Sequence, residues 1–464
     1  MSPPCLSELQ KRLVDWNLDA ALNPAAAPGK RGPYKCIFTP LITLWYLIFQ
    51  RLNADQRQAA AVLDALQGGA DALAEPGKWP SQELITSQTG TYNEARQRLP
   101  EAVLREVYEH SARKLAPSEG VGSLPKVQFM DGTLIAVLTN PELSEAYPPA
   151  SNQHGTSDWS QLRCVAAFEW QNGGAHAAAQ APTTTSEQVL AWEIFRQSPP
   201  GTLSVGDCNF GVYSVVQGAR HYQQHSLVRL TPVRAKRLGG SAHWTSGQEQ
   251  VVTWAPTEND QLHAEADAAP VIGRLIFQRV QRPGFPPIAI WLFTTLMDGQ
   301  EFTPEVLLKL YGIRWRAETN FNYLKTHLKL KELTARSPAM ARKEFYAALI
   351  AYNLIREGMQ YCAKTLQVPV GRVSFQAVRR ALSHDLAALI AGDGGKTRRL
   401  KGLLLPIRTK VRPNEPREVR KRNQTYPPLR GSRSEARIRA AKKLAEACKL
   451  ADLTANPTLQ PNSL

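Results

Sequence analysis

The feature that most constrains the fold is a series of apolar, strand-like segments in the middle of the 464-residue chain. "KVQFM" and "TLIAVL" flank Asp131 and Gly132, and "QLRCVAAFEW" and "GTLSVGD" follow. Between the last two, "EQVLAWEIFRQ" has the apolar spacing of a helix. "PIAIWLFTTL" is apolar at almost every position, which predicts a strand buried on both faces. Helices placed among apolar strands predict an α/β protein.

Helical patterns flank this strand-rich middle. Up to about residue 122, apolar residues recur every three or four positions in segments such as "TPLITLWYLIFQRL", "TYNEARQRL" and "EAVLREVYEHSARKL". Thr39-Pro40 and Asn53-Ala54-Asp55 have the residue types that begin helices. Helical spacing returns from residue 341 to 390, whereas residues 216–284 contain short β-like segments and turns.

The distribution of charge predicts the kind of partner. The net charge is +16, so a polyanion is expected. Between Lys396 and Lys443 there are 17 lysines and arginines, three acidic residues and five prolines. This composition predicts an extended basic arm followed by a short helix. The arm is either a solvated, disordered tail or a segment that neutralises DNA phosphates.

Cysteine usage and hydropathy predict a cytosolic protein. The six cysteines are scattered and form no CxxC pair, which argues against a zinc knuckle and against a secreted disulfide framework. The first residues lack the apolar core of a signal peptide. The most apolar run, "CIFTPLITLWYLIFQ", is too short to cross a bilayer, so no membrane partner is expected.

One helical stretch, "YGIRWRAETNFNYLK", sets a single carboxylate among several cations. Thr303 and Pro304 predict the start of the long helix that contains it. On an ideal α-helix, four of its residues fall within an arc of about 60°. They are Tyr311, Arg314, Glu318 and Lys325. The simplest interpretation is an Arg-Glu pair one turn apart, with Trp315 and Phe321 as core contacts. The stripe has a larger role only if other acids converge on it.

Two aspartates at strand ends are the candidates for that convergence. Asp131 follows "KVQFM", although Asp-Gly between strands is also a hairpin signal. Asp207 follows "TLSVG", where it could equally belong to a turn or a helix cap. Strand ends are where α/β sheets place their chemistry. Two such aspartates and Glu318 would form an oxygen-only cluster that needs a cation, for which Mg²⁺ or Mn²⁺ is suited.

These residues resemble the motifs of DDE transposases of bacterial insertion sequences. The chain matches the Y-x2-R-x3-E-x6-K pattern of one subgroup at Tyr311, Arg314, Glu318 and Lys325. "DGT" at Asp131 and "GDCNFGVY" around Asp207 resemble the two other acidic motifs. Further segments are similar to the family, including "FTPLITLWYLIFQRL", "TGTYNEARQRLP", "KEFYAALIAYNLIR" and the basic "RPNEPREVRKRNQTYPPL".

The resemblance implies an RNase H-like catalytic core, a mixed five-stranded sheet with helices on both faces, interrupted by a β-rich insertion. Applied to this chain, it predicts a helical, DNA-end-binding region at 1–122 and a catalytic domain at 123–345. The insertion is expected at about 216–284, and a helical region with the basic arm at 346–464. In the cell, the protein is expected in the bacterial cytoplasm, associated with the nucleoid.

The resemblance also implies a reaction. A dimer on paired transposon ends would cleave double-stranded DNA and join the 3′-hydroxyl to target DNA by metal-dependent phosphoryl transfer. Asp131 would bridge two Mg²⁺ ions, with Mn²⁺ as a substitute, and Asp207 and Glu318 would each hold one. Tyr311, Arg314 and Lys325 would bind phosphates beside the scissile bond.

Two alternatives belong to other classes of protein. One is a DNA-binding protein of transposase descent that no longer cuts. The other is a zinc-dependent hydrolase centred on the HxxxH spacing of His221 and His225, although no HExxH motif is present. Trp244 and Trp254 in the insertion are interpreted as packing residues, with stacking on a flipped base as the alternative.

Overall fold

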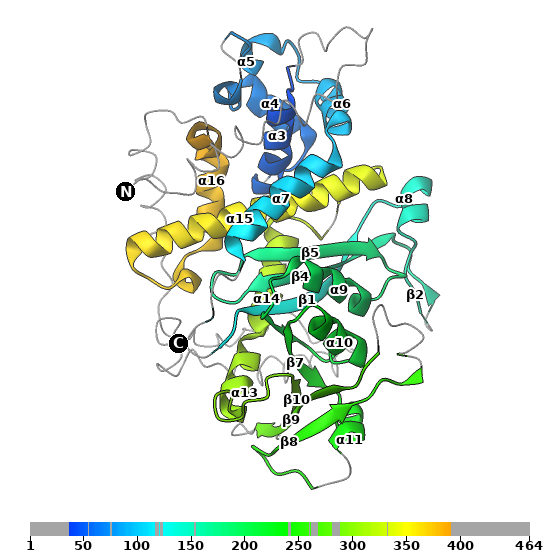
Figure 1. The fold of residues 1–464 in the computed structure, drawn as a ribbon. Helices are drawn as coiled ribbons and strands as arrows, with labels where there is room; N and C mark the ends of the chain where they lie inside the picture. Colours follow the sequence, from blue (N-terminus) through cyan, green and yellow to red (C-terminus); the bar gives the residue numbers. More distant parts are fainter. Residues whose placement is uncertain are drawn as a thin grey trace, which may run out of the picture.

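A computed structural model describes the chain from residue 37 to residue 390, with short gaps. The described residues are 37–53, 55–74, 77–116, 120, 124–152, 155–239, 243–258, 260, 268–280, 288–331 and 333–390. The predicted basic arm and the first 36 residues lie outside this part of the chain. Figure 1 shows a group of helices at one end of the molecule, packed on a large sheet.

Eight strands form the central sheet. In spatial order they are β5 (Ala175–Pro182), β4 (Gln161–Glu169), β1 (Val127–Ala136), β6 (Leu203–Gly206), β7 (His225–Leu230), β10 (Ile288–Thr294), β9 (Val271–Val280) and β8 (Glu249–Trp254). β6 is parallel to both β1 and β7, and every other neighbouring pair in this sheet is antiparallel. The first five strands form the mixed sheet expected of an RNase H-like core, so the predicted fold class is confirmed. The last three extend it.

Side chains alternate between two cores on opposite faces of this sheet. In β1, Phe129 belongs to one apolar cluster and Met130 to the other, because successive residues of a strand point to opposite faces. The helices α9 (Glu187–Gln197) and α10 (Tyr213–His221) cover the Met130 face. α7 (Glu101–Leu115), α14 (Trp315–Asn322) and α15 (Pro338–Leu366) cover the Phe129 face.

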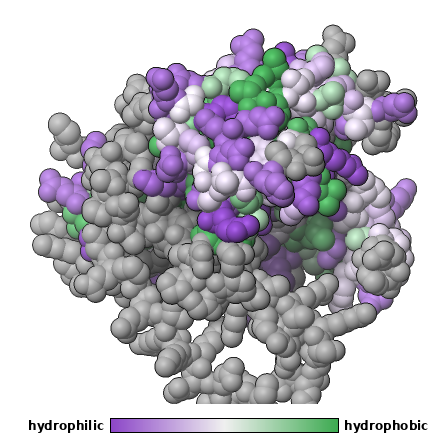
Figure 2. Space-filling view, turned by 90° about the horizontal axis from the view of Figure 1, so that it is seen from below, coloured by the Kyte–Doolittle hydropathy of each residue, from purple (hydrophilic) through white to green (hydrophobic). Residues whose placement is uncertain are grey.

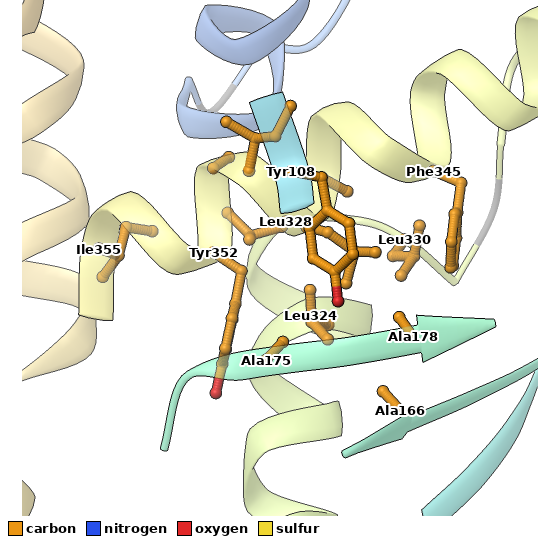
Figure 3. Packing of buried hydrophobic residues seen from close by; sticks show 14 of the residues in the cluster. Tyr108, Ala166, Ala175, Ala178, Leu324, Leu328, Leu330, Phe345, Tyr352 and Ile355 are labelled. Atoms are coloured by element: carbon orange, nitrogen blue, oxygen red, sulfur yellow. The ribbon is translucent and has the colours of Figure 1, made fainter. Parts of the chain in front are cut away.

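Small side chains let helices approach the Phe129 face closely. Figure 3 shows Tyr108 of α7 and Tyr352 of α15 beside Ala175 and Ala178 of β5. All four are buried. The hydroxyl of Tyr352 also donates a hydrogen bond of 2.7 Å to the carbonyl of Gly173 in the β4–β5 turn. α15 is therefore fixed to the edge of the sheet by both apolar and polar contacts.

The helical end contains α3 (Pro40–Leu52), α4 (Gln58–Leu66), α5 (Pro80–Glu83), α6 (Gly90–Arg98) and α7. The Thr39 hydroxyl accepts from the Ile42 amide at 3.3 Å, so the predicted start of α3 is confirmed. The predicted start at residues 53–55 is wrong. Asn53 ends α3, and α4 begins at Gln58 with no side-chain cap. Asp55 instead binds the side chain of Arg57 at 2.7 Å.

A buried ion cluster ties these helices to α15. Glu344 accepts from Arg51 of α3 at 2.7 Å and from Arg96 of α6 at 2.8 Å. Lys343 of α15 donates to the carbonyls of Arg96 and Gln97, each at 3.0 Å. The helical end and α15 therefore share one apolar core and one set of buried charges, although they lie far apart in the sequence.

The range predicted as a β-rich insertion contains both strands and helices. It includes the end of α10, the core strand β7, helix α11 (Pro232–Gly239), and strands β8 and β9. Seen from below, the described surface is mainly hydrophilic, with smaller hydrophobic areas (Figure 2). Among the described residues, no helix is both long and apolar enough to cross a membrane.

Candidate active site

Asp131 and Asp207 lie side by side at the same level of two parallel strands. Phe129 of β1 pairs with Val205 of β6, and each aspartate comes two residues later. Residues two apart share a face, so both side chains belong to the Phe129 face. Neighbouring strands are about 4.7–4.9 Å apart. The carboxyl end of β6 and the middle of β1 therefore bring the two acids together.

The hairpin interpretation of Asp131-Gly132 is wrong. β1 runs without interruption through both residues, which pair with Ala166 and Val165 of β4. The two strand-like segments of the sequence are one strand of 10 residues. Asp131 is only partly exposed there, and its Oδ1 accepts from the Gly132 amide at 3.0 Å.

Glu318 approaches the same face from α14. The ring of Phe321, on this helix, meets the ring of Phe168 of β4 edge to face at 5.0 Å. Phe168 pairs with Phe129, so α14 lies over the strand that carries Asp131. Phe321 is a core contact as expected, but Trp315 is 37% exposed and is not.

The pKa of Asp131 depends on its own burial and on the charges around it. Burial raises this pKa to about 6, the nearby Arg314 opposes the rise, and the negative charges of Asp207 and Glu318 add to it. Like charges at close range disfavour ionisation of each. Asp207 and Glu318 therefore each lie near enough to Asp131 to disfavour its ionisation, and a cation bound beside Asp131 would oppose that effect.

Arg314 is the buried cation of this cluster. Its Nη2 donates to Oε1 of Glu318 at 2.8 Å, with 9% of the arginine side chain and 59% of the glutamate side chain exposed. Burial opposes the charge of Arg314, but Tyr311, Asp131 and Glu318 outweigh burial, so its pKa is raised. The Arg-Glu pair expected from the sequence exists. It is not an ordinary surface pair, because the arginine is buried beside a second carboxylate.

The stretch from Tyr311 to Lys325 is not one continuous α-helix, and that expectation is wrong. α13 (Pro304–Ile313) begins at the Thr303 cap as predicted, α14 begins at Trp315, and a π-helical turn, η2, covers Tyr323–His327. Angles that assume an ideal α-helix therefore do not place these side chains. π-helical turns inside helices are frequently found at functional sites.

Tyr311 interacts with Arg314 and Asp207, and Lys325 interacts with Phe321 and Cys164. The Arg314 guanidinium carbon is 5.9 Å from the centre of the Tyr311 ring, and the negative charge of Asp207 acts on the Tyr311 hydroxyl. Lys325 Nζ is 5.9 Å from the centre of the Phe321 ring. The positive charge of Lys325 also reaches Cys164, which pairs with Thr133, two residues after Asp131.

Comparison with known proteins identifies the family. A family model described as "Transposase DDE domain" matches residues 122–354, half of the chain. The chain belongs to the DDE transposases. It is 24% identical over 356 residues to the transposase InsG for insertion sequence element IS4 of Escherichia coli (strain K12), a match that covers 72% of this chain and 77% of that protein. The resemblance to an insertion-sequence transposase is confirmed.

A solved transposase structure is also similar. It is the piggyBac transposase synaptic complex with hairpin DNA, with a TM-score of 0.40 and 10% identity, covering 89% of this chain and 84% of that chain.

DDE transposases use divalent metal ions, and the three acids of this transposase have the chemistry to hold one. Their donors are carboxylate oxygens, which hard divalent cations prefer. Within the described ranges, however, no three Asp, Glu, His or Cys side chains are already arranged around one point. Glu318 is held by Arg314 instead. The donor set suits a hard cation once the Glu318 carboxylate turns from the arginine toward the aspartates.

The histidine alternative gains no support in the described part of the transposase. His221 lies at the end of α10, where its ring is 5.7 Å from that of Trp192, and His225 lies in β7. The helical HxxxH geometry is therefore absent, because the two residues lie on different elements. The described residues provide no third ligand beside them.

Sequence reasoning missed Arg229. Gly206 of β6 pairs with Val228 of β7, so Arg229 lies at the level of Asp207 on the next parallel strand. It shares the face of Leu227, which belongs to the Phe129 core, and its charge acts on Tyr311. A single arginine in the apolar strand "HSLVRL" was the available signal.

The two insertion tryptophans pack against aromatic residues of β10. The ring centre of Trp254 is 5.0 Å from that of Phe293, and Trp254 is buried. The ring centre of Trp244 is 5.1 Å from that of Trp291. These contacts favour the packing interpretation over base stacking for both residues.

Proposed function

We propose that this transposase cleaves DNA at the ends of its insertion sequence and joins the freed 3′-hydroxyl to target DNA. Asp131, Asp207 and Glu318 would be its metal-binding residues. The observation that carries the proposal is the position of the two aspartates at one level of adjacent parallel strands. The charge of Glu318 also raises the pKa of Asp131. The family membership supplies the reaction class.

Each residue of the site then has a distinct role. A divalent ion, when bound, stabilises charge on the attacking and leaving oxygens of an in-line displacement. Mg²⁺ is the proposed ion, with Mn²⁺ as a substitute and two ions per site. The three carboxylates hold the metal. Arg314, Lys325 and the Tyr311 hydroxyl bind phosphates next to the scissile bond, and we add Arg229 to this group on its position beside Asp207.

The pair between Arg314 and Glu318 links phosphate binding to metal binding. The guanidinium donates to Glu318 at 2.8 Å, so one N–H of Arg314 and one oxygen of Glu318 are engaged with each other rather than with DNA or metal. A DNA phosphate offers Arg314 another anion and can accept two hydrogen bonds from it. Binding of the DNA backbone would therefore release the Glu318 carboxylate. The arginine at this position does more than neutralise the glutamate.

We also propose that the partner is double-stranded DNA, bound by a dimer on paired ends. The N-terminal helical region would recognise the terminal repeats, and the basic arm would neutralise phosphates. One cation of the N-terminal helical region is unsuited to contact DNA. Arg96 of the segment "NEARQRL" is buried and paired with Glu344, whereas Arg98 is exposed. The exposed cations of α6 and α7 are the better candidates.

A nicking assay tests the proposal. Purified protein, Mg²⁺ and a plasmid carrying the sequence's own terminal repeats should give cut strands, and Asp131→Ala, Asp207→Ala and Glu318→Ala should abolish cutting while repeat binding persists. The matched control is Glu305→Ala, which removes an exposed acid at the start of α13. Cutting by any of the three variants would refute the assignment. Binding without cutting by the wild type would favour the inactive DNA-binding alternative.

A further inference from the structure

A fourth carboxylate, Glu187, approaches the site from the opposite face of the sheet. It is the first residue of α9, a helix that contributes Leu190, Ala191, Ile194 and Phe195 to the Met130 core. A Cβ added to Gly132 would lie 2.3 Å from Cδ of Glu187 and 2.5 Å from each of its carboxylate oxygens. Only glycine leaves room for this carboxylate beside β1. Because Asp131 and Gly132 point to opposite faces, Glu187 does not join the three acids directly.

Glu187 instead holds the turn that follows Asp207. Its Oε2 accepts a hydrogen bond from Nδ2 of Asn209. The next residue, Gln188, donates from Nε2 to Oδ1 and to the carbonyl of Asn209, each at 2.9 Å. The carboxylate can only accept, so these partners fix which way the Asn209 amide points. Two consecutive side chains of α9 thus hold one asparagine.

Asn209 in turn contacts Asp207, the proposed metal-binding residue. Its backbone amide donates to Oδ1 of Asp207 at 2.9 Å. α9 is itself well anchored, because the Ser186 hydroxyl caps it at 3.3 Å and Leu190, Ile194 and Phe195 are buried. The chain of contacts therefore runs from a packed helix through Asn209 to one oxygen of Asp207.

We propose that Glu187 is a positioning residue which, through Asn209, orients the Asp207 carboxylate for the divalent metal ion. The inference rests on the function proposed above. Contacts behind a metal ligand fix its orientation, and their loss commonly weakens metal binding by about 10–100-fold. The glycine of the "DGT" motif then has a physical reason, since a larger residue would push Glu187 away from Asn209.

The test measures Mn²⁺ binding by calorimetry on the full chain without DNA, together with the Mn²⁺ concentration that half-activates nicking. Glu187→Ala and Asn209→Ala should each raise the Mn²⁺ dissociation constant about tenfold or more. They should raise the half-activating concentration in parallel and leave the nicking rate at saturating Mn²⁺ near that of the wild type. The double variant should be no worse than either single one, because both act through one contact chain.

Two further variants complete the design. Glu187→Gln keeps an acceptor for Asn209 and should stay within about twofold of the wild type. Glu193→Ala, which removes an exposed acid from the same helix, is the matched control. If Glu187→Ala does not fold, Asn209→Ala on its exposed turn tests the same link. Wild-type Mn²⁺ affinity in the alanine variants would overturn the positioning role alone, whereas a wild-type protein that neither binds Mn²⁺ nor cuts would overturn the proposed function.

Discussion

Replacing Glu344 with alanine should destabilise the whole protein. The carboxylate is 2% exposed, and Arg51 and Arg96 are 6% and 4% exposed. Besides its bonds to both arginines, it accepts from the Thr334 amide at 3.1 Å. The substitution would leave two guanidinium groups buried without a counter-charge. It would also leave the junction between α3, α6 and α15 without its central contact.

The expected cost follows from this burial. Removing one partner of a buried ion pair typically costs about 3–5 kcal/mol, because the remaining charge is left without compensation. The unfolding entropy of a cooperative unit of about 300 residues is roughly 0.6 kcal/mol per degree. The melting temperature should therefore fall by about 5–8 °C.

Thermal unfolding followed by circular dichroism measures this directly. The control is Glu94→Ala, which removes an exposed partner of Arg98 on α6, 3.7 Å away, and should shift the melting temperature by no more than about 1 °C. A Glu344→Ala protein that melts within a degree of the wild type would refute the reasoning. It would mean that the helical end and the sheet do not unfold together, or that water solvates the charges of Arg51 and Arg96 in the variant.

The same residue predicts a dependence on pH. Burial alone would raise the pKa of Glu344, but Arg51 and Arg96 outweigh it and hold the pKa below its usual 4.5. A carboxyl group with a lowered folded pKa adds stability above its unfolded pKa, and that stability is lost as the pH falls through the folded value. Glu344→Gln should therefore lose less stability than the wild type on acidification below pH 4.5. If the free energy of unfolding fell with pH equally in Glu344→Gln and in the wild type, the predicted sign would be wrong.

Three further predictions concern DNA. The Lys325→Ala protein should melt normally and cut DNA poorly, and the salt dependence of its binding to the transposon ends should fall by about one phosphate contact. Normal cutting with an unchanged salt dependence of binding would mean that Lys325 is a solvated surface charge. Arg229→Gln should lower cutting and the salt slope in the same way if the cation beside Asp207 binds phosphate, and it would be a bystander if both stay at wild-type values. Arg98→Ala on α6 should reduce the preference for terminal repeats over random DNA in a competition assay, while an unchanged preference would count against end recognition by this helix. Deleting residues 1–122 is a poor substitute for that last test, because α3 and α7 share the core of α15.

The sequence predicted most elements whose apolar pattern is local. α9 coincides with "EQVLAWEIFRQ", which has a helical period, and β10 lies within "PIAIWLFTTL", which is a short continuous apolar run. β5 was missed because "AHAAAQAP" is rich in alanine, which favours helix in isolation. In the folded protein, these small side chains are needed where α7 and α15 pack on the sheet. Such a tertiary requirement overrides local propensity.

At the site, too, local motifs were recognised from the sequence, whereas long-range contacts were not. The three acids were predicted as metal ligands from their motifs, and that role stays a prediction, whereas which strands neighbour each other depends on long-range pairing that one sequence does not display. The hairpin interpretation of Asp131-Gly132 failed for this reason: β4 pairs with both residues and keeps them extended. The break at Arg314 and the π-helical turn after Asn322 were likewise not predicted from the local pattern. The positions of Arg229 and Glu187 beside the site can be inferred only when the register of the strands is known.

The central claim is that Asp131, Asp207 and Glu318 form one metal site, and iron-directed cleavage of the protein chain tests it most directly. Fe²⁺ in place of the native ion, with ascorbate and peroxide, produces hydroxyl radicals that cut the backbone near the bound metal. The account predicts cuts close to residues 131, 207 and 318 together, suppressed by Mn²⁺ and reduced at all three places by Asp131→Ala. Cuts near only one of these residues, or cuts that Mn²⁺ does not suppress, would contradict a shared site.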